Sequence, residues 1–265
     1  MPKIRIAING AAGRMGQRLI ALASADPQLA LAAALESSSH PKLGTDAGLI
    51  AGVGNLGVPL SDGLDGKVDV VIDFSTPAGT ARILERCCSM HLPLVVATTG
   101  LSGAQHEKLR EASQQVAILS APSMSLAVNL AMKLCASAAT ALKDHPSGAD
   151  VEIIERHHRF KEDSPSGTAL KFGQIIADIM GQTQQRHGRE GRPGERPHGE
   201  IGYHAVRVGD NPGEHTIIFG LLGETLELAV RATNRDCYAH GALAAAKFLA
   251  GQPPGMYGMN DVLGL

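Results

Sequence analysis

Apolar and polar positions follow two alternating periods through the first half of the chain. Short, mainly apolar runs typical of buried strands occur at residues 3–8, 29–35, 68–74, 93–97 and 116–119. Between them, apolar residues recur at helical spacing, as in the segment from Thr80 to Cys88. Strands that alternate with helices predict a parallel sheet with right-handed crossovers. The first half is therefore expected to be an α/β unit.

The pattern changes after a long helix of small residues predicted over 125–142. A strand at 150–156 and a helix at 170–180 come next, and further strands are expected at 201–208, 214–220 and 224–232. Residues 225–231 alternate strictly, so that strand should bury one face. The pattern predicts an open mixed sheet with few covering helices, which often packs against another subunit. The basic, Gly- and Pro-rich stretch 183–200 is expected to be a mobile loop that could attract an anionic substrate.

A last alanine-rich helix over 238–249 is expected to return to the first half of the structure. This gives a division in which residues 1–125 and 235–265 form one domain. Residues 126–234 form the other.

Composition removes several classes of function. The 265 residues include 24 basic and 26 acidic side chains, for a formal net charge of -2, which gives no electrostatic case for nucleic-acid or membrane binding. Aromatic residues make up 3% and tryptophan is absent, so base-stacking surfaces are not expected. The four cysteines form neither a disulfide framework nor a zinc pattern, which favours a cytoplasmic protein. No signal peptide or membrane-spanning run is expected.

The first strand is followed by a glycine pattern. Gly10, Gly13 and Gly16 give G-x-x-G-x-x-G between a strand and a helix, a variant of the dinucleotide-binding fingerprint. Glu36 lies twenty residues past Gly16, at the end of the next strand, where an acidic residue binds the adenosine ribose. The alternative is a strand-ending acid that faces water. Ser37 comes next, at a position where an arginine or lysine would favour the 2′-phosphate of NADPH. Glu36 and Ser37 together therefore permit NADH and do not strongly favour NADPH.

Later strand ends carry small polar residues along the same predicted edge. Thr98 and Thr99 follow one strand, and the turn 121–124 follows the next. Ligands of open parallel sheets bind at this edge, so these residues are candidates for the nicotinamide side of the cofactor. Ordinary turn chemistry is the alternative.

The densest chemistry lies between residues 155 and 169. His157 and His158 are followed by Lys161, and a Pro-Ser-Gly-Thr turn over 165–168 opens the next helix. Histidine exchanges protons near neutrality, and a protonated lysine can donate a proton or pair with a carboxylate. Free N–H groups at a helix start bind carboxylate or phosphate. The alternative is a solvated basic loop with Ser166 or Thr168 as helix cap, and no metal-binding pattern is present.

These two motifs together resemble the 4-hydroxy-tetrahydrodipicolinate reductase (dihydrodipicolinate reductase) family over essentially the whole chain. The resemblance rests on residues 10–16, 73–75, 97–100, 155–169, 213–216 and 261–263. It implies a Rossmann-like parallel-sheet nucleotide-binding domain and an α+β substrate domain with an open mixed sheet. It also implies a homotetramer built through those sheets, and NADH or NADPH as cofactor.

The same resemblance implies reduction of a cyclic imino-dicarboxylate at C4, with loss of the 4-hydroxyl as water, in lysine biosynthesis through diaminopimelate. It assigns His157 as proton donor and acceptor, and Lys161 as proton donor. Substrate carboxylates are assigned to His158, Gly167 and Thr168. The residues assigned to the cofactor are Gly10, Ala11, Ala12, Gly13, Arg14, Met15, Glu36, Ser37, Ala97, Thr98, Thr99, Ala121, Pro122, Ser123 and Met124. No metal is implied.

Three positions depart from the family pattern. Ser37 stands where some relatives carry an arginine for the 2′-phosphate, and Ser123 stands where asparagine is usual. Phe160 replaces a frequent histidine but spares the proposed catalytic pair. There are two alternative functions: an amino-acid dehydrogenase of the aspartate or homoserine type, and a non-catalytic dinucleotide sensor. The cluster at 157–161 disfavours the dehydrogenase. A sensor would have no need of a proton donor beside a carboxylate-binding site.

Overall fold

The computed structural model describes residues 2–265, which divide into two units. The first runs to Leu126 and resumes at Asp236–Leu265, and the second is Ala127–Arg235. The sheet of the first unit has seven strands within the described residues, in the order β12-β6-β5-β4-β1-β2-β3, and every pairing is parallel. The strands are β1 Ile4–Asn9, β2 Leu29–Leu35, β3 Leu60–Ser61, β4 Val70–Asp73, β5 Leu94–Val96, β6 Ala117–Ser120 and β12 Gly255–Tyr257.

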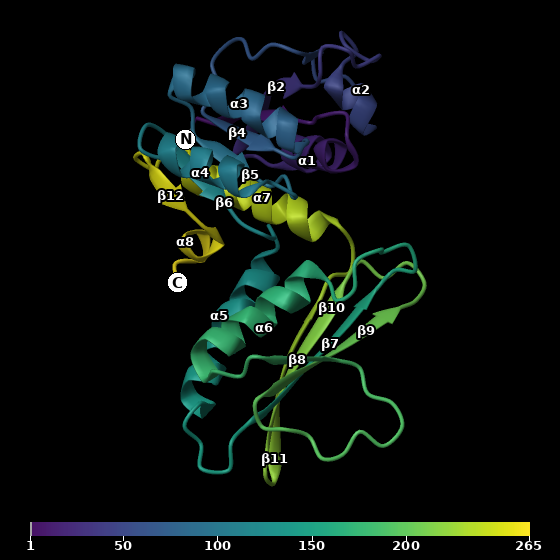
Figure 1. Cartoon of the computed structure of the whole chain (residues 1–265). Coiled ribbons are helices and arrows are strands. Elements are labelled where there is room, and N and C mark those ends of the chain that lie inside the picture. Colours follow the sequence, from purple (N-terminus) through teal and green to yellow (C-terminus); the bar gives the residue numbers. More distant parts are fainter. Residues whose placement is uncertain (1) are drawn as a thin grey trace. The chain divides into compact units, whose positions relative to one another are not determined.

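Helices cover both faces of this sheet, as in the upper part of Figure 1. Helices α1 (Arg14–Ala25) and α7 (Asp236–Leu249) share a core with one set of strand residues, among them Ile6 and Ile8. The alternate residues, such as Ala7, pack with α3 (Pro77–Met90) and α4 (Gly103–Ala112). Short helices α2 (Ala47–Ala51) and α8 (Met259–Leu263) complete the unit. The central strands β1, β4, β5 and β6 are thus buried on both faces, which explains why their residues are mainly apolar.

The strand order confirms the doubly wound parallel sheet that the sequence predicts. The direction of winding reverses between β1 and β4, and ligands of such folds bind at the carboxyl ends of the strands beside that reversal. The glycine turn follows β1 at this point. Topology alone therefore places a candidate dinucleotide site at residues 10–16.

The second unit is built on a mixed five-stranded sheet of order β11-β10-β7-β9-β8. β7 pairs parallel to β9 and antiparallel to β10, which confirms the mixed sheet predicted from the sequence. The strands are β7 Asp150–His157, β8 Gln184–His187, β9 Glu200–Arg207, β10 Glu214–Leu221 and β11 Glu224–Arg231. The helices are α5 Leu126–Leu142 and α6 Gly167–Met180.

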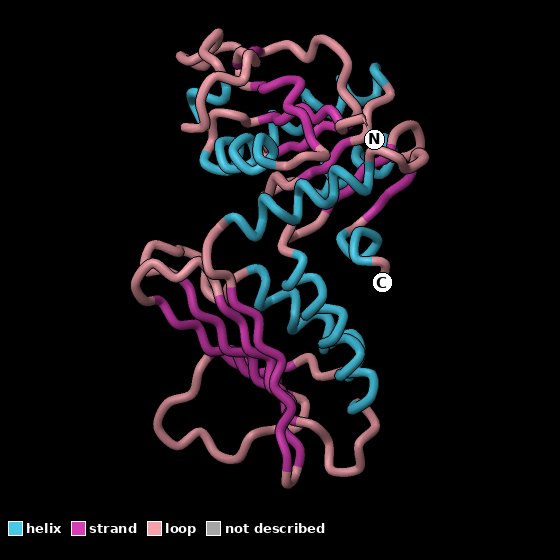
Figure 2. Tube along the Cα trace, turned by 180° about the vertical axis from the view of Figure 1, so that it is seen from behind, coloured by secondary structure: helices cyan, strands magenta, loops and turns pink. Residues whose placement is uncertain are grey.

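One face of this sheet is covered by the helices of its unit, and among the described residues the other face carries no helix. Val151, Ile153 and Phe219 pack with Phe172 of α6, and all four are fully buried. The tube in Figure 2 shows both helices on the same side of the strands. On the opposite face, Ile154 keeps 37% of its surface exposed. Strand alternation therefore separates a core face from an open face.

The basic stretch 183–200 is a loop, as predicted, except that it begins with the short strand β8. Two of its arginines bind the open face of the sheet. Arg189 donates to both carboxylate oxygens of Glu152, at 2.7 and 3.0 Å, and Arg196 adds a bond of 3.0 Å. His204 Nε2 lies 2.7 Å from the same carboxylate. Burial acts to raise the pKa of Glu152, but these partners outweigh it and lower the pKa to about 2. Both arginines are thus engaged internally.

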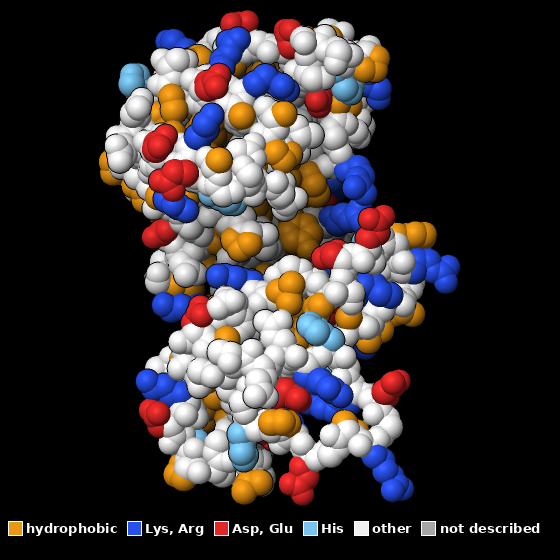
Figure 3. Space-filling view, in the orientation of Figure 1, with side chains coloured by type: hydrophobic (Ala, Val, Ile, Leu, Met, Phe, Trp, Pro, Cys, Tyr) orange, Lys and Arg blue, Asp and Glu red, His pale blue; other side chains and the backbone are white. Residues whose placement is uncertain are grey.

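The surface is mixed in charge. On the face shown in Figure 3, basic and acidic side chains are interspersed over both units, in agreement with the net charge of -2. Among the described residues, no helix combines the length and apolarity needed to cross a bilayer.

Candidate active site

The glycine turn after β1 is shaped for close approach of a ligand. Gly10 has φ +79°, and a Cβ there would lie 2.5 Å from the carbonyl oxygen of Phe74, so a side chain would displace the turn. Gly13 is the N-cap of α1 and offers no side-chain oxygen to the first turn. The N–H groups of that turn therefore stay available for an anion, which fits the pyrophosphate of a dinucleotide.

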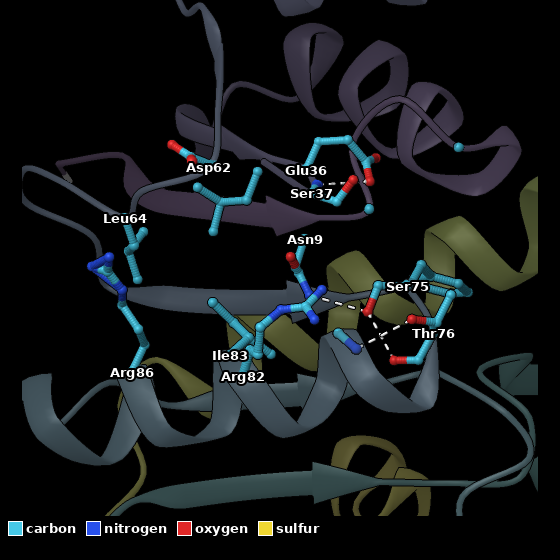
Figure 4. Close-up of a pocket in the computed structure, with 15 residues that line it drawn as sticks. Asn9, Glu36, Ser37, Asp62, Leu64, Ser75, Thr76, Arg82, Ile83 and Arg86 are labelled. Atoms are coloured by element: carbon cyan, nitrogen blue, oxygen red, sulfur yellow. Dashed lines mark hydrogen bonds between the residues drawn. The ribbon is translucent and has the colours of Figure 1, made fainter. Parts of the chain in front are cut away.

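A cavity of about 480 Å³ lies beside this turn, with Glu36 and Ser37 at the end of β2 on one wall (Figure 4). Glu36 accepts hydrogen bonds from the N–H of Ala12 at 3.3 Å and the N–H of Ser37 at 3.1 Å. Gly10 and Gly13 also line the cavity. The structure therefore brings the acidic residue to the glycine turn, as a ribose-binding carboxylate requires.

Asp73 joins the strand ends next to the cavity. Its side chain is fully buried, and its carboxylate accepts four hydrogen bonds of 2.5–2.8 Å. The donors are Asn9, Ser75, Thr80 and Thr98. Because these residues belong to the ends of three neighbouring strands and to α3, the carboxylate fixes their relative positions. Thr98, a predicted cofactor residue, is thus held at the predicted edge.

The other predicted nicotinamide-side residues lie at this edge but outside the cavity of Figure 4. Ala97 and Thr99 flank Thr98 after β5, and the N–H of Ala97 donates to the carbonyl of Asp73 at 2.9 Å. Residues 121–124 follow β6, and Met124 is buried. The structure therefore groups the predicted residues at one sheet edge, around two separate stretches.

In the second unit, His157 ends β7 with its imidazole buried and bonded to Glu155. Its Nδ1 lies 2.5 Å from Oε2 of Glu155, and the two side chains point to the same face because they are two residues apart in a strand. A carboxylate on one ring nitrogen fixes the tautomer, since Nδ1 then carries the proton. Nε2 remains for a substrate.

Glu155 is itself held by cations and N–H groups, although only 1% of its surface is exposed. Arg207 donates to both oxygens, at 2.7 and 2.8 Å, and the N–H of Ser166 donates at 3.0 Å. Burial acts to raise the pKa of Glu155, but Arg207 and His157 prevail and the pKa falls below its ordinary value. The carboxylate is therefore charged at neutral pH.

His215 completes the buried group from β10. Its Nε2 lies 3.1 Å from the hydroxyl of Ser166, and its ring packs edge-on to His157 with centroids 5.2 Å apart. Burial, followed by repulsion from His157, lowers the pKa of His215 to about 4. Burial likewise lowers the pKa of His157, although Glu155 opposes the shift. Both rings are thus neutral at pH 7, and His157 can accept a proton.

Space at His157 depends on Gly213. A Cβ at this position would stand 2.9 Å from Nε2 of His157, and its φ of +149° disfavours other residues. Any side chain there would press on the one imidazole nitrogen that Glu155 leaves unused. Gly213 therefore keeps that nitrogen accessible.

Lys161 and His158 lie in the turn between β7 and α6. Nζ of Lys161 donates to Asp163 at 2.6 Å, and only 20% of the lysine side chain is exposed. Lys161 lowers the pKa of Asp163 below its ordinary value. Nδ1 of His158 is a buried atom without a hydrogen-bond partner among the described residues. An unpaired polar atom in a binding region is suited to a ligand oxygen.

Helix α6 begins beside this group. Ser166 is its N-cap, and the hydroxyl accepts from the N–H of Ala169 at 3.2 Å. Gly167 and Thr168 occupy the first turn, where N–H groups have no intrahelical partner. The end of β7, strand β10, the turn after β7 and the start of α6 thus form one site. It combines the imidazole of His157, the ammonium of Lys161 and an anion-binding helix start. No group of three or more His, Cys, Asp or Glu within residues 2–265 could hold a metal ion.

Two consecutive segments of the chain match the two halves of a known family. Residues 4–124 match the family described as "Dihydrodipicolinate reductase, N-terminus", and residues 127–263 match "Dihydrodipicolinate reductase, C-terminus". The chain belongs to the dihydrodipicolinate reductase family. It is therefore an NAD(P)H-dependent oxidoreductase, and the resemblance inferred from the sequence is confirmed.

Similar proteins cover nearly the full length of this dihydrodipicolinate reductase family member. A 4-hydroxy-tetrahydrodipicolinate reductase of Rhodopirellula baltica is 54% identical, covering 99% of this chain and 96% of the relative. The enzyme of that name from Syntrophotalea carbinolica is 46% identical, with 99% of each covered. A dipicolinate-bound dihydrodipicolinate reductase from Paenisporosarcina sp. TG-14 has a TM-score of 0.79 at 27% identity, covering 98% of this chain and 99% of its own.

Sequence reasoning missed several contributors to this reductase site. Glu155 and His215 lie inside stretches used for the resemblance, but neither was assigned a role. Arg207 lies outside those stretches and resembles any strand-ending arginine. The alternating pattern of β9 places Arg207 on the core face, where an unpaired cation is costly, and this signal could have identified it.

Proposed function

We propose that the chain reduces 4-hydroxy-tetrahydrodipicolinate to tetrahydrodipicolinate, with loss of water, in the diaminopimelate route to lysine. One hydride and one proton are taken up and the 4-hydroxyl leaves as water, so atoms and charge balance. The names of the relatives at 54% and 46% identity support this substrate. Residues 1–125 and 235–265 serve as the cofactor domain, and residues 126–234 serve as the substrate domain.

The roles of individual residues follow from their surroundings. When bound, the reduced nicotinamide supplies the hydride. His157, held neutral with Nε2 open, accepts a proton and returns it, and Lys161 donates a proton to the reacting substrate. The first turn of α6, at Gly167 and Thr168, binds one substrate carboxylate, and His158 binds the other.

One observation carries this proposal: the Glu155–His157 pair lies beside the start of α6. Oε2 of Glu155 meets His157 and Oε1 meets the N–H of Ser166, so one buried carboxylate connects the proton-transfer residue with the anion-binding turn. A dinucleotide sensor would have no use for this connection. An amino-acid dehydrogenase would share only the cofactor unit.

The reaction is tested by the loss of absorbance of NADH, and separately of NADPH, with freshly generated 4-hydroxy-tetrahydrodipicolinate. We expect oxidation of reduced cofactor that depends on the substrate and stops when the substrate is consumed. Aspartate semialdehyde, which a homoserine dehydrogenase would reduce with the same cofactors, serves as the control substrate. Cofactor binding without oxidation by this substrate would contradict the proposed reaction.

The proposal includes a homotetramer formed through the open face of the mixed sheet. Ile154 of β7 and Val206 of β9 lie on this face and are 37% and 39% exposed, with no helix of their unit over them. Apolar side chains on an uncovered sheet face favour association. The proposal also places the enzyme in the cytoplasm, which is consistent with the partly exposed thiols of Cys88 and Cys237.

Charge on the open face is expected to break the assembly. In light scattering after gel filtration, wild type should have about four times the mass of one chain, and Ile154→Lys combined with Val206→Lys should have a smaller mass. The control is Leu49→Lys on α2, which is 57% exposed in the first unit. A monomeric wild type, or a tetramer that survives both lysines, would exclude this interface.

A further inference from the structure

Two arginines of α3 enter the cavity that holds Glu36. Gly79, Arg82, Ile83 and Arg86 all line it and are spaced three and four residues apart, so they form one face of the helix. This face stands opposite the end of β2. In Figure 4 the side chain of Arg82 points toward Asn9, and that of Arg86 lies beside Leu64.

Neither arginine has a carboxylate partner in the part of the chain that the structure describes. Within residues 2–265 no ion pair or hydrogen bond joins Arg82 or Arg86 to an acidic side chain, although Glu36 and Asp62 line the same cavity. Glu36 is engaged instead by the N–H groups of Ala12 and Ser37. Of the four other arginines described in the first unit, three are paired with a carboxylate: Arg5 with Asp69, Arg18 with Asp236 and Arg110 with Glu107.

The charge of the cavity decides which cofactor it accepts. A carboxylate at Glu36 binds ribose hydroxyls, and it repels a 2′-phosphate by like charge. Ser37 supplies a hydroxyl but no cation at the usual position. A guanidinium on the facing helix offsets the repulsion, and its planar N–H groups can bind two phosphate oxygens at once.

We propose that Arg82, assisted by Arg86, binds the 2′-phosphate of NADPH. The chain thus recognises NADPH through cations on α3 and not through the residue after Glu36. The inference rests on the proposed cofactor site of the first unit. It replaces the prediction made from Glu36 and Ser37 in the sequence, which is that the site does not strongly favour NADPH.

The test compares two nucleotides that differ only in the 2′-phosphate: adenosine 2′,5′-bisphosphate and 5′-AMP, titrated by calorimetry. We expect wild type to bind the bisphosphate at least tenfold more tightly, and Arg82→Gln to remove most of this ratio while changing the affinity for 5′-AMP little. Arg82→Lys should keep part of the preference for the bisphosphate over 5′-AMP, because the positive charge is retained. Arg110→Gln on α4, an exposed arginine paired with Glu107, is the matched control and should leave the ratio unchanged.

A second variant separates charge from packing. Ser37→Arg in the Arg82→Gln background should restore the preference, since it returns a cation from the opposite wall. Three results would overturn the inference. Wild type could bind both nucleotides with equal affinity, Arg82→Gln could leave the ratio of the two affinities unchanged, or Arg82→Gln could lower both affinities by the same factor. The last result would mean that Arg82 stacks on adenine. If neither nucleotide bound wild type, the cofactor site itself would fail, a different result from binding without discrimination.

Discussion

Replacing Lys161 by methionine should lower kcat by about 10²- to 10⁴-fold, because the stem is retained while the proton-donating ammonium is lost. Its ammonium is held by Asp163 at 2.6 Å, in the turn before α6. NADH and NADPH should bind with unchanged affinity, since the proposed cofactor residues belong to the other unit. Steady-state turnover and fluorescence titration of NADPH measure the two effects separately.

Lys171 provides the control for this substitution. It lies on α6 with its side chain exposed, so Lys171→Met removes a nearby charge without touching the turn. Its kcat should stay within a factor of about two of wild type. If Lys161→Met also kept kcat within about threefold, Lys161 would not be the proton donor.

Replacing Glu155 by glutamine should lower kcat by about 100-fold or more, because the tautomer of His157 is no longer fixed by a carboxylate. Glu155 also acts to raise the pKa of His157, which burial lowers. Without that charge the pKa of His157 falls further. The acidic limb of the kcat/KM profile, where His157 must lose its proton, should therefore move to lower pH.

The same substitution also affects stability, which must be separated from catalysis. Arg207 would be left mostly buried with 19% of its side chain exposed and no anion, a change that costs about 3–5 kcal/mol. Adding Arg207→Met removes the second charge, so most of the free energy of unfolding should return. We expect kcat to remain low. The acidic limb should stay below that of wild type but move part of the way back, because the charge of Arg207 also acts to lower the pKa of His157. A double variant with wild-type kcat would show that the pair only supports the fold.

The arrangement of the first unit could be predicted because its signals are local. Each buried strand is a mainly apolar run, and each major crossover carries helical spacing. Shorter elements were missed for a physical reason: β12 has three residues and forms only by pairing with β6, and β8 has four exposed residues paired with β9. Such segments gain their structure from a partner far away in sequence.

The same distinction explains the site. His157, Lys161 and Gly167 lie within eleven residues, so their proximity is visible in the sequence. Arg207 meets Glu155 because β9 pairs with β7 in the register that sets Arg207 opposite His157. A shift of one residue would turn Arg207 to the other face. No local pattern encodes that register.

The start of α6 lies where the sequence offers a cap. The helical apolar spacing predicts a helix over 170–180, and Ser166 or Thr168 is the candidate cap before it. The structure selects Ser166, whose hydroxyl accepts from the N–H of Ala169 while its own N–H donates to Glu155, so the helix begins at Gly167. The sequence alone predicts that the arginines of residues 183–200 are solvated or attract an anionic substrate. Their actual partner, Glu152, could not be predicted because it is distant in sequence.

The division of the chain has a consequence for synthesis on the ribosome. The core of the first unit includes α7, and its sheet is completed by β12, yet both follow residue 235. At translation rates of about 5–20 residues per second, the 109 residues of Ala127–Arg235 emerge over roughly 5–20 s while that core lacks one covering helix. The inserted unit, continuous in sequence, can fold first. The nascent cofactor unit meanwhile exposes the apolar strand face that α7 later covers, and this is the period in which chaperones would act on it.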